Sequence, residues 1–248
     1  MNLALAIGAG VAGAAVGWGA GFLDVHLESV EGLQKEEGEE RAEYEAEVAQ
    51  KAEAARVAGE EAPAALPWAS ESYGWTWLEI YLAPVLGAFG FSLFAGRHGL
   101  TWVSAEDLLW TAVFIHITIF DLKHRLILDL VTYPAFVVAL VLAAVTPGLS
   151  ILQAVIGAVG MGGFFLIFHV VSRRGLGLGD VKLVALIGAV AGLGAGHYQA
   201  LEAIVVGVFL GGVVALLLLI TRIRSLKDPI PYGPFLCVGA VVVLYLSL

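Results

Sequence analysis

The strongest constraint on this chain is a series of long apolar segments, most of them near the length that crosses a lipid bilayer. They cover residues 3–23, 77–96, 103–120, 130–146, 151–171, 181–195, 200–221 and 232–248. A transmembrane helix needs roughly 20 predominantly apolar residues. The segments are continuous, whereas the strands of a membrane barrel alternate apolar and polar residues. The sequence therefore predicts an all-α, polytopic membrane protein with about eight transmembrane helices.

Residues 24–76 form the long polar segment of the chain. They hold 14 of its 22 acidic residues but only 4 of its 13 basic residues. Acidic runs of this kind are typical of solvated surface. We therefore expect three parts: a first transmembrane helix (1–23), an acidic loop (24–76) and a seven-helix membrane core (77–248). No basic patch indicates binding to nucleic acid, so the expected surroundings are the lipid bilayer.

The basic residues predict how these segments are oriented. If the chain crosses the bilayer eight times, 12 of its 13 Lys and Arg residues lie on one side and Arg97 lies on the other. Positive residues concentrate on the cytoplasmic side of membrane proteins. The sequence thus predicts a multi-pass protein of the inner (plasma) membrane, with the acidic loop in the cytoplasm and both termini outside.

Two aspartates lie at the predicted cytoplasmic boundary. Asp121 follows segment 103–120 and Asp180 precedes segment 181–195, so both have the same depth although 59 residues separate them. Acids at such positions are costly and suggest a function, although Asp180 is equally a candidate helix cap. If the two helices pack together, the pair shares one proton; the ionised acid then activates a water and the protonated acid polarises a carbonyl. This chemistry needs no metal and no cofactor.

Three motifs stand at predicted cytoplasmic boundaries. In chain order they are Phe120-Asp-Leu-Lys-His-Arg-Leu-Ile-Leu-Asp-Leu-Val-Thr-Tyr-Pro134, Gly177-Leu-Gly-Asp-Val-Lys-Leu183 and Ile230-Pro-Tyr-Gly-Pro-Phe-Leu236. They resemble the first catalytic segment, the GxGD motif and the segment that opens the last helix of the prepilin peptidases, a family of membrane aspartic proteases. The resemblance covers roughly residues 103–248.

The resemblance implies a function and a site. Asp121 and Asp180 would be the catalytic pair, and the reaction would remove the leader of type IV pilin-like precursors. Gly177 and Gly179 would let the loop shape itself around an extended peptide. Lys182 matches a motif position and is a candidate substrate-binding residue, although a Lys one turn into a helix also extends to the membrane interface for reasons of solvation alone.

The N-terminal part departs from the family. Cys237 is the only cysteine, so the loop at 24–76 lacks the two Cys-x-x-Cys pairs of many bifunctional members. This excludes their form of zinc binding, and the resemblance does not extend to N-methylation by S-adenosylmethionine. Asp24 stands where the family has Asn near the end of the first helix. Asp129, eight residues after Asp121, is a candidate cap for the next helix.

Other classes of protein remain open at this point. A proton-coupled transporter also carries acids at membrane depth, but its acids are expected near the midplane and with internal repeat symmetry. A presenilin-type protease shares a GxGD sequence, yet the accompanying Pro-Ala-Leu segment is missing. A catalytically idle pilus-assembly protein is the third alternative. His116 and His169 lie within apolar segments, where a single His is more often a hydrogen-bonded structural residue than a metal ligand.

Overall fold

The computed structural model describes residues 3–30, 46, 49–50, 75–99, 101–146, 150–172, 176–192, 198–221 and 231–247. In these ranges the chain forms eight α-helices and no strand. The helices are α1 (Leu3–Val30), α3 (Ala83–His98), α4 (Trp102–His124), α5 (Asp129–Val145), α6 (Ile151–Ser172), α7 (Leu178–Ala191), α8 (Gln199–Ile220) and α9 (Gly233–Ser247). A π-helical turn, η1 (Leu78–Leu82), leads directly into α3.

The helices confirm the all-α, polytopic membrane class that the apolar segments predict. Four of them are long and apolar enough to cross a bilayer, namely α1, η1 with α3, α6 and α8, while α5 and α9 are shorter apolar helices. The predicted segments and the observed helices agree to within a few residues at most ends. The exception is α1, which continues past residue 23 to Val30. Most of the predicted acidic loop, and with it any helix there, lies outside the described residues.

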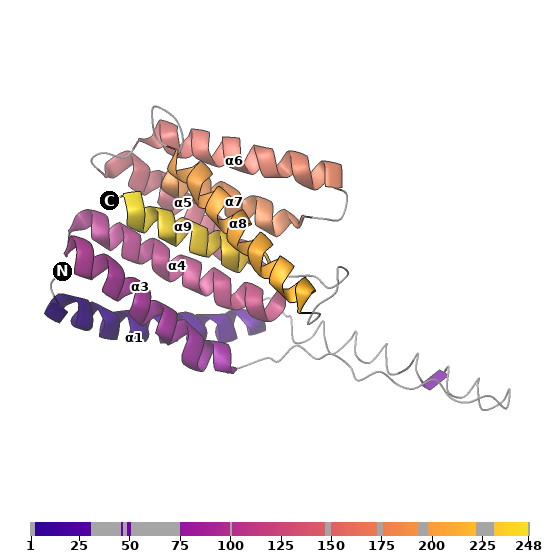
Figure 1. Ribbon diagram of the computed structural model, residues 1–248, viewed down its shortest axis with the longest axis horizontal. Helices are drawn as coiled ribbons and strands as arrows, with labels where there is room; N and C mark the ends of the chain where they lie inside the picture. Colours follow the sequence, from indigo (N-terminus) through magenta and orange to yellow (C-terminus); the bar gives the residue numbers. More distant parts are fainter. Residues whose placement is uncertain are drawn as a thin grey trace.

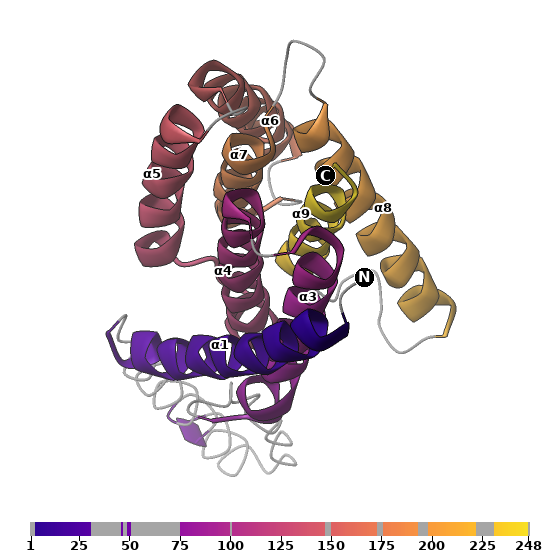
Figure 2. The same ribbon diagram turned by 90° about the vertical axis from the view of Figure 1, so that its left-hand side faces the viewer.

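The bundle is assembled from packed pairs of helices. α1 packs against α3, α6 packs against α7, and α8 packs against α9. Viewed along the bundle, α4 occupies the centre, with α1 below it and α9 beside it (Figure 2). The two termini lie together at one end, whereas α4 ends and α7 begins at the other end (Figure 1). The segments that carry Asp121 and Asp180 are therefore at the same end of the bundle.

Close packing of α1 and α3 depends on small residues. Gly13, Gly17 and Gly21 recur every four residues and form one face of α1. A methyl group at Gly13 would lie 2.1 Å from the carbonyl oxygen of Gly87, and one at Gly17 would lie 2.1 Å from that of Ala83. Without side chains the two backbones approach closely, as small residues at four-residue spacing allow in membrane helices.

α7 is enclosed by other helices beyond its first turn, although Leu178 at its start is 52% exposed. It packs against α5, α6, α8 and α9, and Leu183, Val184, Leu186 and Ile187 are all 0% exposed. With 14 residues it is about 21 Å long, shorter than the hydrocarbon core of a bilayer. A short helix locked into the core holds its first turn, and thus Asp180, in a fixed position.

Candidate active site

Asp121 lies in the last turn of α4, just beyond the apolar segment 103–120. The helix ends at Arg125, whose φ of 53° and ψ of 34° are left-handed. The Arg125 N–H donates to the carbonyl oxygen of Asp121 at 2.9 Å. A left-handed conformation costs a non-glycine residue about 1–2 kcal/mol. The chain therefore turns sharply one turn after Asp121 and directs residues 126–128 back across the end of the bundle.

The start of α9 covers the Asp121 carboxylate. Asp121 is buried, and its Oδ2 accepts a hydrogen bond from the backbone N–H of Gly233 at 3.1 Å. A methyl group at residue 233 would lie 2.6 Å from the same oxygen. Only glycine at this position lets the backbone come close enough to donate without a clash. Gly233 belongs to the Pro-Tyr-Gly-Pro motif, but the sequence interpretation assigned no role to it.

Asp180 lies in the first turn of α7, three residues after the N-cap residue Gly177. Its carboxylate accepts a hydrogen bond from the backbone of Gly177. An acid at this position that reaches back to the N-cap N–H forms half of a capping box. Asp180 thus stabilises the start of α7 from within the helix rather than as its N-cap residue.

Gly179 brings the two motifs together. A methyl group at Gly179 would lie 3.2 Å from Cβ of Ile127, which is tighter than an ordinary van der Waals contact. Ile127 follows the left-handed turn at the end of α4, so the glycine lets the start of α7 pack against the segment after Asp121. α9 packs against both α4 and α7 from the other side. The two carboxylates are held within electrostatic range of each other.

Both aspartates, which lie outside the apolar segments, are shifted toward their protonated forms. Burial raises the pKa of Asp121 to about 7, and the like charge of Asp180 adds to the increase, against the Gly233 N–H and the Arg125 charge. Burial also raises the pKa of Asp180, while the hydrogen bond from Gly177 opposes the increase. Two interacting acids of this kind hold one proton between them over a range of pH.

Cys237 and Thr118 complete the surroundings of the pair. The thiol of Cys237, on α9, hydrogen-bonds with the Thr118 side chain on α4 and interacts electrostatically with both aspartates. Cys237 is buried, with 1% of its surface exposed. No feature of the sequence predicts that this cysteine lies beside the two acids. Among the described residues, no group of three His, Cys, Asp or Glu side chains is arranged to hold a metal ion.

Lys182 contacts Asp129 rather than either of the paired acids. Its Nζ lies 2.6 Å from Oδ1 and 2.8 Å from Oδ2 of Asp129, and it also lies 5.4 Å from the ring centroid of Tyr133. The expectation that Asp129 caps α5 is wrong, because the N-cap residue is Leu128 and no side chain caps that end. Asp129 lies in the first turn instead, where it ties α5 to α7. A role for Lys182 in substrate binding remains a prediction.

A buried charge network, missed by the sequence interpretation, lies on another face of α4. Lys123 Nζ is 2.5 Å from Oε1 of Glu28 on α1 and 2.7 Å from Oε1 of Glu79 in η1. His124 Nε2 lies 3.0 Å from the same oxygen of Glu28. Both glutamates are 0% exposed. We call these four residues the Lys123 network; it fastens α1 and η1 to the end of the helix that carries Asp121.

The histidines within the apolar segments are engaged in structural contacts. His116 Nδ1 lies 2.5 Å from Oδ1 of Asp24, which explains how a buried acidic residue is accommodated in the last third of α1. His169 Nδ1 lies 2.7 Å from the carbonyl oxygen of Leu176, so it ties α6 to the segment before α7. Both observations confirm the interpretation of these histidines as structural residues.

Comparison with known proteins places these motifs in a family. The sequence profile of the type IV leader peptidase family matches residues 108–220, which include both aspartates. The prepilin leader peptidase/N-methyltransferase of Pseudomonas aeruginosa is 28% identical over 156 residues, which are 60% of this chain and 52% of the relative. The protein of that name from Aeromonas hydrophila is 32% identical over 150 residues, 58% of this chain and 50% of the relative. This chain spans about half the length of these two relatives.

A shorter relative matches over most of its length. Leader peptidase HopD of Escherichia coli is 33% identical over 144 residues, and the alignment covers 55% of this chain and 89% of HopD. No solved structure matches the chain. The match to nearly all of HopD, together with the profile match across both aspartates, shows that this chain belongs to the type IV leader peptidase family.

Proposed function

We propose that this protein is a membrane aspartic endopeptidase that removes the leader of type IV pilin-like precursors. The observation that carries the proposal is the electrostatically coupled pair of the buried Asp121 and the partly buried Asp180, held by Gly233 and Gly177. Family membership supports the choice of substrate, because the relatives are named prepilin leader peptidases.

The chemistry follows from the sharing of one proton by two acids. The ionised acid takes a proton from a water molecule while the water oxygen bonds to the scissile carbonyl carbon. The protonated acid gives its proton to the carbonyl oxygen, which forms a neutral tetrahedral intermediate. The intermediate collapses when the C–N bond breaks: the first acid gives its proton to the leaving amine nitrogen, while one hydroxyl of the intermediate re-forms the C=O bond and returns its proton to the second acid. The products are a peptide carboxylate and a new amino terminus, and the pair returns to its starting state.

The residues around the two acids have separate tasks in this scheme. The Gly233 N–H favours the ionised form of Asp121, because a hydrogen bond to a carboxylate stabilises its charge. The glycines at 177 and 179 leave space around Asp180 for the extended backbone of the substrate. Lys182 is assigned a weaker role at the edge of this loop, since its ammonium is paired with Asp129.

We further propose the orientation that the basic residues predict. The acid pair lies at the cytoplasmic face of the inner membrane, the acidic loop at 24–76 is cytoplasmic, and both termini are outside. The termini lie together at the end of the bundle away from the acids, which supports this arrangement (Figure 1). The division into a first helix, an acidic loop and a peptidase core at 77–248 is kept in this proposal, with the first boundary moved from residue 23 to Val30, where α1 ends.

Cleavage by purified protein tests the proposal. The unaltered protein, reconstituted in liposomes, should release the leader from a pilin-like precursor, whereas Asp121→Asn and Asp180→Asn variants should each be inactive. Asn keeps the shape and the hydrogen-bond acceptor but cannot exchange the proton. Full turnover by either variant, or ion flux through the liposomes without any cleavage, would refute the assignment.

A further inference from the structure

A large apolar groove leads to Asp180. It has a volume of about 940 Å³ and lies between α6 and α8, with the start of α7 at one end. Each long helix contributes residues at four-residue spacing, so that each presents one face to the groove. These are Gly160, Phe164 and Phe168 of α6 and Leu201, Val205 and Phe209 of α8. A stretch of eight residues on a helix extends about 12 Å.

The groove is open on the side of the bilayer. Phe164 is 53% exposed, Val205 is 57% exposed and Phe209 is 68% exposed. α6 and α8 are both long enough and apolar enough to cross a membrane, so their uncovered faces meet lipid. A molecule can therefore enter sideways from the hydrocarbon region without passing through water.

Asp180 is the only charged residue among the described residues that line the groove. It lies at the end formed by α7, where Leu176 of the GxGD loop is also part of the wall. An occupant must therefore be apolar along its length and must present a polar group only at this end. A peptide whose scissile bond reaches Asp180 and whose adjacent segment is an apolar helix meets both conditions.

We propose that the groove binds the apolar, membrane-embedded segment of the substrate next to the scissile bond, as a helix of about two turns. This inference rests on the proposed function and assigns substrate specificity to the faces of α6 and α8. Because lipid tails are as apolar as the substrate, affinity comes from shape and close packing rather than from burial of apolar surface. Filling the groove should therefore weaken binding of the substrate through loss of fit.

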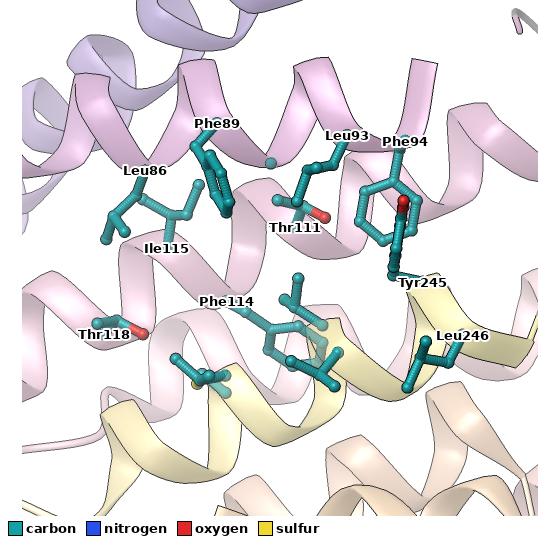
Figure 3. Close-up of a pocket in the computed structure, with 15 residues that line it drawn as sticks. Leu86, Phe89, Leu93, Phe94, Thr111, Phe114, Ile115, Thr118, Tyr245 and Leu246 are labelled. Carbon is teal, nitrogen blue, oxygen red and sulfur yellow. The ribbon is translucent and has the colours of Figure 1, made fainter. Parts of the chain in front are cut away.

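A second apolar cavity provides a matched control. It has a volume of about 380 Å³ and lies between α3, α4 and α9, where Phe89, Phe114 and Tyr245 line it (Figure 3). Its walls include neither aspartate, although Thr118 and Cys237, which lie beside the pair, line part of it. Val238 lines this cavity and is 44% exposed, whereas Val205 lines the groove. Val205→Trp and Val238→Trp thus make the same change at two exposed sites, and only the cavity at Val205 has an acid in its wall.

The test compares two substrates in liposomes of phosphatidylethanolamine and phosphatidylglycerol. One is a complete pilin-like precursor, and the other is a short soluble peptide that contains only the residues around the cleavage site. Val205→Trp should raise KM for the precursor by roughly tenfold or more, as steric changes in apolar pockets do. It should leave kcat/KM for the short peptide within about twofold. Val238→Trp should change neither.

Four other outcomes overturn the inference. An unchanged KM for the precursor means that the groove holds lipid instead, and an equal loss with both substrates means that the variant damages the acid pair. If Val238→Trp raises KM for the precursor as much as Val205→Trp does, the groove is not the site that binds the substrate. Cleavage of neither substrate by the unaltered protein refutes the proposed function and this inference with it. In addition, a photoreactive group placed at Val205 in an Asp180→Asn protein should crosslink to the precursor, and adducts to lipid alone would contradict the proposal.

Discussion

Removal of the Lys123 charge provides a demanding test of the structure. The ammonium lies 2.5 Å from Glu28 Oε1 and 2.7 Å from Glu79 Oε1, with 2% of the Lys123 side chain exposed. Lys123→Met keeps most of the volume but leaves two buried carboxylates without their shared cation. His124 remains beside Glu28 and Thr76 still donates to Oε2 of Glu79, but neither carboxylate keeps its lysine. Breaking a buried ion pair by removal of one partner costs about 3–5 kcal/mol.

This cost predicts a large fall in thermal stability. For a chain of this size, 1 kcal/mol corresponds to roughly 2–4 °C in Tm. The Tm of Lys123→Met in detergent at pH 8 should therefore fall by about 6–20 °C. The defect should shrink as the pH falls, because the stranded carboxylates of the variant take up protons in the folded state and the buried charge disappears.

Two further variants separate this explanation from a general loss of lysine. Lys182→Met removes a lysine from a pair whose side chains are 32% and 51% exposed. Exposed pairs contribute about 1 kcal/mol or less, so this control should shift Tm by less than about 4 °C. Adding Glu28→Gln and Glu79→Gln to Lys123→Met should recover most of the lost stability. The reasoning about the network is refuted if Lys123→Met has the same Tm as the unaltered protein. It is also refuted if the Tm of the triple variant is no higher than that of Lys123→Met.

The remaining predictions concern the acid pair and the helix contacts. Because hydrolysis needs one protonated acid, kcat should fall as pH rises through about 7, where Asp121 loses its proton; a rate that is flat from pH 6 to 9 would contradict this. Gly233→Ala places a methyl group 2.6 Å from Asp121 Oδ2 and should lower kcat by roughly 10-fold to 100-fold. Gly212→Ala is the control, because its added methyl group meets nothing within 4 Å, and it should leave kcat unchanged. Equal kcat values for the two variants would refute the contact between Gly233 and Asp121. Gly13→Ala forces α1 away from α3 and should lower Tm by several degrees, since overpacking costs about 1–3 kcal/mol; an unchanged Tm would argue against close contact of the two helices.

Local sequence pattern predicts the helices because hydropathy and length are properties of single segments. The errors at helix ends have identifiable causes. The segment predicted to end at residue 195 ends at Ala191, since Gly192 adopts a φ of 74° and terminates α7. α1 runs seven residues beyond its predicted end because Asp24 and Glu28 are paired with His116 and Lys123 from α4. A charge that ends an apolar segment in sequence need not end the helix when a partner is supplied by another helix.

The sequence predicts the two acids of the candidate site but not the residues that hold them. Topology and motifs predict that Asp121 and Asp180 lie at one depth, because membrane crossings fix the end of the bundle for each residue. The partners that hold them have no such signal. The donor to Asp121 is a backbone N–H 112 residues away, and a backbone group has no residue identity to recognise. The Lys182–Asp129 pair likewise joins residues 53 apart, on helices whose adjacency no periodicity reveals.

The contact between Gly233 and Asp121 also determines when, during synthesis of the chain, the surroundings of Asp121 become complete. Ribosomes extend a chain by roughly 5–20 residues per second, so the donor at residue 233 is made roughly 6–22 seconds after the acid that it serves. Until α9 inserts, Asp121 lacks this N–H and the wall that covers it. In the proposed mechanism, a nascent chain that already holds both acids is therefore inactive until α9 has inserted.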